Sequence, residues 1–118
     1  MMGRVPLQGS RTVAAQITSY LNEKYIDFKI GHLGTGVQVI MNDIPEKVWK
    51  GLIAPEFVRI AKEIDLTVAA AHYGSHTDGG ISLEVVLSKW TAMDFARQGW
   101  LLTEPNVEGV DYYASPRM

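Results

Sequence analysis

Apolar and polar side chains alternate most regularly over residues 81–88. The side chains expected to face a core there are Ile81, Leu83, Val85 and Leu87. Because the side chains of a strand point alternately to its two faces, this pattern predicts a strand with one face in a core and the other near water. Residues 66–73 contain good strand formers, and a glycine-rich stretch separates them from this strand, so we expect a hairpin over residues 66–88.

A second hairpin is predicted over residues 27–41. Phe28 and Ile30 alternate with polar residues before a turn that contains Gly34, and Val37 and Val39 follow with the same spacing. Glycine adopts backbone angles that other residues resist, which suits a tight turn between two strands.

Four segments carry apolar residues at helical spacing. They cover residues 11–24, 45–52, 55–64 and 91–100. Proline lacks a backbone N–H and clashes with the preceding helical turn, so we expect Pro55 to separate the second helix from the third. Thr91 and Asp94 have the spacing of a weak capping box at the start of the last helix.

These elements predict an α+β fold in a single domain, residues 1–118. We expect a four-stranded, mostly antiparallel sheet built from the two hairpins, with the helices packed mainly on one face. Residues 1–9 and about 103–118 contain prolines and glycines without a long periodic pattern. We therefore expect both ends of the chain to be irregular.

Composition narrows the function classes. The chain has 118 residues, a net charge of −2 and no cysteine, which argues against a strong nucleic-acid binder and excludes disulfides and thiolate metal sites. Residues 1–62 carry a net charge of +3, so weak binding of single-stranded nucleic acid through this basic half is an alternative. We see no signal peptide or membrane span and expect a cytoplasmic protein.

Three histidines and an aspartate suggest a second alternative, a metal-dependent hydrolase. His32, His72, His76 and Asp78 are the candidate ligands, because imidazole and carboxylate groups bind zinc and similar ions. Residues four apart on an extended strand are, however, about 13 Å apart, too far to share one ion unless the loop bends back. We therefore favour ordinary hydrogen-bonded histidines at strand ends, and we predict no cofactor.

The leading hypothesis is a small, non-enzymatic protein-interaction module, such as a binder, an accessory subunit or an inhibitor of a larger complex. It would act through the sheet face turned away from the helices, and a homodimer would be one use of that face. The side chains expected there are Lys29, Leu33, Gln38, Ile40, Tyr73, Glu84 and Val86. The sequence leaves open whether the C-terminal tail covers this face instead.

Overall fold

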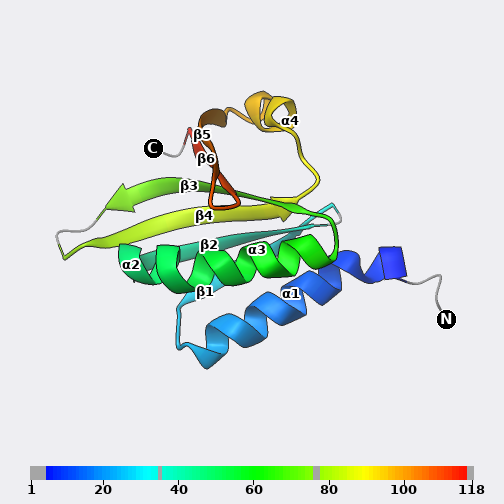
Figure 1. Ribbon diagram of the computed structural model, residues 1–118, viewed down its shortest axis with the longest axis horizontal. Helices are drawn as coiled ribbons and strands as arrows, with labels where there is room; N and C mark the ends of the chain where they lie inside the picture. The colour runs from blue at the N-terminus through cyan, green and yellow to red at the C-terminus, as the bar shows by residue number, and fades with distance from the viewer. Residues whose placement is uncertain (1–4, 35, 76–77, 117–118) are drawn as a thin grey trace.

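The computed structural model describes residues 5–34, 36–75 and 78–116 (Figure 1). Along the chain the elements are α1 (Val5–Glu23), β1 (Phe28–Leu33), β2 (Gly36–Pro45), α2 (Glu46–Val48), the π-helix η2 (Trp49–Ile53), α3 (Ala54–Glu63), β3 (Thr67–Ser75), β4 (Gly80–Ser88), α4 (Ala92–Arg97), β5 (Leu101–Val107) and β6 (Val110–Ala114). No helix in these ranges is both long and apolar enough to cross a lipid bilayer.

The fold is α+β, but the predicted four-stranded sheet is wrong. One six-stranded sheet runs in the order β1-β2-β4-β3-β6-β5. Strands β3 and β6 pair in parallel, whereas the other neighbours pair in antiparallel fashion. The sheet is therefore mixed, and the C-terminal tail supplies two of its strands.

The two predicted hairpins are confirmed as β1–β2 and β3–β4. The four side chains Ile81, Leu83, Val85 and Leu87 point into the main core, as their alternation predicts. The other face of β4 is not near water, because Ser82, Glu84, Val86 and Ser88 are buried as well. A strand covered on both faces lies in the middle of the sheet, where layers of side chains pack above and below it.

The tail predicted to be irregular forms the β5–β6 hairpin. Glu108 and Gly109 connect the two strands with φ values of 54° and 92°, and two consecutive residues with positive φ are typical of a tight hairpin turn. Val110 and Tyr113 of β6 are buried. Strand β6 has only five residues, which is too short a stretch to outweigh the nearby proline and glycine in the sequence.

The helices differ from the prediction mainly at their ends. Helix α1 begins at Val5, so the irregular start expected up to residue 9 is wrong from that point on. Pro55 does not break the helical segment: the backbone N–H of Ala54 bonds to the carbonyl of Trp49, five residues earlier, and Pro55 occupies the first turn of α3. A first turn tolerates proline because its N–H would lack a helical partner anyway.

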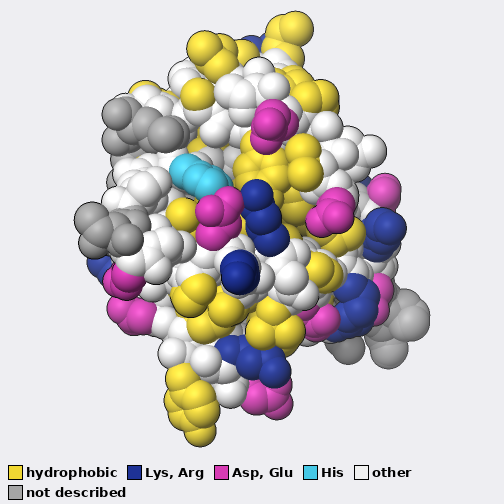
Figure 2. All heavy atoms as spheres, turned by 60° about the vertical axis from the view of Figure 1, so that its left-hand side comes forward, with side chains coloured by type: hydrophobic (Ala, Val, Ile, Leu, Met, Phe, Trp, Pro, Cys, Tyr) yellow, Lys and Arg dark blue, Asp and Glu magenta, His cyan; other side chains and the backbone are white. Residues whose placement is uncertain are grey.

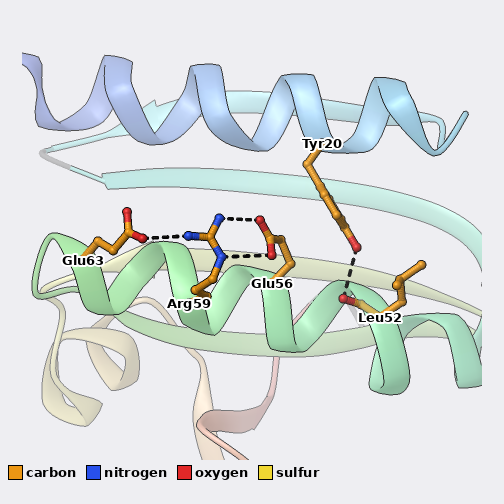
Figure 3. A network of polar contacts seen from close by, with 5 residues as sticks. All are labelled: Tyr20, Leu52, Glu56, Arg59 and Glu63. Carbon is orange, nitrogen blue, oxygen red and sulfur yellow. Dashed lines mark hydrogen bonds and ion pairs between the residues drawn. The ribbon is translucent and has the colours of Figure 1, made fainter.

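Helices α1 and α3 lie side by side over one face of the sheet (Figure 1). Val13, Ile17, Phe57 and Ile60 bury their side chains against the strands there. The Tyr20 hydroxyl donates to the Leu52 carbonyl at 3.1 Å and so joins α1 to η2 (Figure 3).

On α3, Arg59 lies between Glu56 and Glu63 (Figure 3). Its guanidinium nitrogens are 2.6 Å from a carboxylate oxygen of Glu56 and 2.7 Å from one of Glu63. These ion pairs are exposed, and such pairs contribute little to stability. The packing of the apolar side chains, rather than this network, fixes α1 and α3 on the sheet.

Helix α4 lies on the opposite face of the sheet (Figure 1). Phe95 and Trp100 pack there against Ala69, Ala71 and Tyr113. The small alanine side chains leave room for large rings above them. The expectation that the helices pack mainly on one face is therefore wrong for α4, which covers part of the face predicted to be open.

Candidate functional site

A pocket forms where α4 and the preceding loop meet the second face of the sheet. Its volume is about 230 Å³, and it is lined by Leu33, Gln38, Glu84, Val86, Trp90, Phe95, Gln98 and Trp100. Four of these residues, Leu33, Gln38, Glu84 and Val86, are among the seven that the sequence placed on an interaction face. The pocket is the main candidate site because it combines a buried acidic side chain with aromatic walls.

The strand register brings the polar groups of the pocket together. Gln38 of β2 pairs with Val86 of β4, and Ile40 pairs with Glu84, so Gln38 and Glu84 lie diagonally across two neighbouring strands on one face. The Gln38 side-chain amide donates a hydrogen bond to Oε2 of Glu84. This contact joins β2 to β4 on the pocket side of the sheet.

Glu84 is only 5% exposed. Moving a carboxylate out of water is costly unless donors or positive charge compensate it. Glu84 also lines the cavity, so a ligand group that carries donors or positive charge can approach it from there.

Aromatic rings form the wall above Glu84. Trp90 meets Phe95 edge to face with centroids 5.1 Å apart, and Phe95 stacks on Trp100 at 5.3 Å. Edge-to-face and offset stacked rings stabilise one another beyond their buried area. The faces of such rings carry negative potential and attract cations.

The predicted capping box is confirmed and positions this wall. The Thr91 hydroxyl accepts from the Asp94 N–H at 3.2 Å, and the Asp94 carboxylate accepts from the Thr91 N–H at 2.9 Å. These contacts fix the start of α4 at Ala92, and Phe95 of this helix packs against the sheet.

The other three predicted interaction residues lie outside the pocket. Lys29 of β1 pairs with Ile40 of β2, and Ile40 is half-buried whereas Lys29 is exposed. Tyr73 of β3 is half-buried, and its hydroxyl donates to Oδ1 of Asn42.

The structure separates two of the predicted metal ligands. His32 is on β1 and His72 on β3, and β2 and β4 lie between these strands. Asp78 lies in the connection between β3 and β4, and His76 is outside the described residues. Within residues 5–34, 36–75 and 78–116, no three His, Asp or Glu side chains are grouped so that they could hold a metal ion.

A second pocket, which the sequence did not predict, surrounds His72 on the helix-covered face. Its volume is about 280 Å³, and Lys50, Thr103, Glu104, Val107, Tyr112, Tyr113 and Ala114 line it with His72. Figure 2 shows a face of the molecule on which a histidine, acidic side chains and basic side chains gather beside apolar ones. Most of these residues belong to the β5–β6 hairpin. The sequence could not predict this pocket because it predicted an irregular tail in place of that hairpin.

The polar groups of the second pocket contact one another. The Trp49 indole N–H donates to the Tyr112 hydroxyl at 2.9 Å, and the His72 and Tyr112 rings meet edge to face at 6.1 Å. Trp49 and Lys50 both come from the π-helix η2, and π-helical turns are frequent at functional sites.

Burial sets the protonation of both rings. Burial lowers the pKa of His72. The negative charges of Glu46 and Glu104 oppose this effect, whereas the positive charge of Lys50 reinforces it. Burial also raises the pKa of Tyr112, against the hydrogen bond from Trp49. Both groups are therefore neutral near pH 7.

Comparisons with protein-family models, with curated proteins and with solved structures found no match for this chain. The function therefore has to be inferred from the two pockets themselves.

Proposed function

We propose that this chain is a small protein-interaction module that receives an arginine side chain of a partner protein in the pocket above Glu84. The proposal is supported by the burial of Glu84, which is 5% exposed as a residue, at a cavity lined by Trp90, Phe95 and Trp100. A guanidinium group carries positive charge and several donors, and it stacks on aromatic rings.

The size of the pocket supports a single side chain as its occupant. Pockets for drug-sized ligands have volumes of about 300–1,000 Å³, whereas this one measures about 230 Å³. Arginine is favoured over lysine because its planar group can bond a carboxylate and stack on a ring at the same time. Aromatic pockets that take up an arginine are also common centres of binding energy in protein interfaces.

The experiment uses the three tryptophans as reporters. N-acetyl-arginine amide and its neutral analogue N-acetyl-citrulline amide are titrated into labelled protein, and the indole N–H resonances are followed by NMR. We expect the arginine probe to shift the indole resonances of Trp90 and Trp100, which line the pocket. The resonance of Trp49 should not move, because Trp49 is buried in the core on the opposite face of the sheet. Citrulline should have little effect because it lacks the charge.

Glu84→Gln should weaken binding of the arginine probe at least about tenfold, since it removes the buried charge but keeps the shape. Glu104→Gln is the matched control, because Glu104 lies in the other pocket. Equal shifts from citrulline and arginine, or unchanged arginine binding in Glu84→Gln, would reject the proposal.

Self-association is a further part of this proposal. Lys29, Ile40 and Tyr73 flank the pocket residues on neighbouring strands, and a second copy packed on them would extend the contact around the bound side chain. Light scattering should then give a mass above that of the monomer for the native chain and the monomer mass for Tyr73→Asp. A monomer mass for both the native chain and Tyr73→Asp would contradict the proposed homodimer.

The two alternative functions gain no support. The metal-dependent hydrolase would need His72, His76 and Asp78 together; His76 lies outside the described residues, and no group of three possible metal ligands occurs among the residues that the structure describes. For nucleic acid, Lys50 and Arg59 of the basic half pair with acidic neighbours. The expected cytoplasmic location stays part of the proposal, with the cysteine-free sequence as its support.

A further inference from the structure

The pocket beside His72 carries one positive and one negative side chain. Lys50 comes from η2 and Glu104 from β5, and both line the cavity of about 280 Å³. The three titratable rings of the lining, His72, Tyr112 and Tyr113, are neutral near pH 7 because burial opposes their charged forms. The charged side chains of the lining are therefore Lys50 and Glu104.

Lys50 is able to bind a ligand without leaving its present partner. Its ammonium group lies 3.0 Å from Glu46, and the two side chains are 56% and 47% exposed. Such a surface pair contributes little free energy, and an ammonium group has further N–H donors beside the one used.

Glu104 provides the complementary acceptor. Its side chain is exposed, and it makes no ion pair with any residue that the structure describes. Its negative charge is available to a positively charged group of a ligand.

Neutral groups complete the pocket. The Tyr112 hydroxyl oxygen accepts from Trp49, which leaves its hydrogen free for donation to a ligand oxygen. Neutral His72 offers one donor and one acceptor nitrogen, and Val107 and Ala114 supply an apolar wall. The volume lies just below the range of about 300–1,000 Å³ for drug-sized ligands, which indicates a small molecule.

We propose that this second pocket binds a small zwitterion with the chemistry of a free, apolar α-amino acid. The carboxylate pairs with Lys50 and accepts from the Tyr112 hydroxyl, the ammonium group pairs with Glu104, and the side chain lies against Val107 and Ala114. This site is separate from the arginine pocket above Glu84 and does not depend on it.

Calorimetric titration of the whole chain with glycine, alanine, valine and leucine tests the proposal. For the amino acid that binds best, the N-acetyl derivative lacks the ammonium group and the amide lacks the carboxylate. We expect each derivative to bind at least about tenfold more weakly than the free amino acid, because each loses one charged contact.

Lys50→Gln and Glu104→Gln should each weaken binding of the free amino acid at least about tenfold. Lys47→Gln and Glu108→Gln are matched controls, because Lys47 and Glu108 are exposed and do not line the pocket; they should bind normally. Glu84→Gln should also bind the amino acid normally, which separates this result from the arginine test.

Failure of all four amino acids to bind would overturn the proposal. Equal binding of the amide and the free amino acid would overturn it as well, since the carboxylate would then have no partner. Equal binding of the N-acetyl derivative and the free amino acid would also overturn the proposal, since the ammonium group would then have no contact with Glu104.

Discussion

At the scale of single residues, Glu84 and His72 show what alternation predicts and what it leaves open. The pattern of residues 81–88 placed Glu84 on the face away from the helices, and the structure has it there. The same pattern also predicted water on that face, which is wrong, because a strand pattern contains no information about the segment that later covers it. Trp90 and Phe95 form that cover, but the sequence pattern alone does not distinguish them from ordinary core residues.

The protonation of His72 gives a prediction with a definite sign. Folding lowers its pKa, mainly through burial, so the unfolded chain binds a proton more readily than the folded one as the pH falls. The contribution of neutral His72 to stability is therefore complete above the ordinary value of 6.5, and it is lost as the pH falls from there to the lower pKa of the folded state.

An NMR titration of the His72 imidazole should give a midpoint below 6.5. The free energy of unfolding, measured by urea at a series of pH values, should fall less steeply with acidification in His72→Gln than in the native chain. A midpoint at or above the ordinary value, or identical pH dependence in the two proteins, would contradict this prediction.

At the scale of elements, regular hairpins and helices could be predicted, whereas the tail could not. The β1–β2 and β3–β4 hairpins carry long alternation and glycine turns, so local patterns suffice. The β5–β6 hairpin owes its place to pairing with β3, a contact between residues far apart in sequence. Pro105 and Gly109 made this segment look irregular because they dominate any local pattern in so short a stretch.

Helix α4 has six residues, so its start should depend strongly on Thr91. Thr91→Ala removes the acceptor for the Asp94 N–H and should lower the free energy of unfolding by about 1 kcal/mol, as loss of an N-cap usually does. It should also weaken arginine binding, because Phe95 and Trp100 would be held less firmly. Urea denaturation and the tryptophan titration measure the two effects.

Thr12→Ala is the matched control for this substitution. Thr12 is exposed in the interior of α1, where alanine is the better helix former, so stability should stay equal or rise slightly. An equal loss of stability in both variants would mean that the cap is not the cause.

At the scale of the whole molecule, both candidate sites depend on the order of the strands. Placing β4 at the centre of the sheet buries Glu84 below α4, and adding β6 beside β3 brings Tyr112 to His72. The sequence could identify four of the pocket residues, Leu33, Gln38, Glu84 and Val86, because they follow from strand parity alone. It could not identify Lys50, Glu104 or Tyr112 as neighbours, because strand order is set by long-range packing.

The most direct test of the arginine proposal is a double-mutant cycle between Glu84 and the charge of the ligand. Binding free energies are measured for the arginine and citrulline probes with the native chain and with Glu84→Gln. We expect a favourable coupling of at least about 1.5 kcal/mol, as found for close charge pairs in interfaces. A coupling near zero would contradict it, because the guanidinium group and Glu84 would then not be in contact.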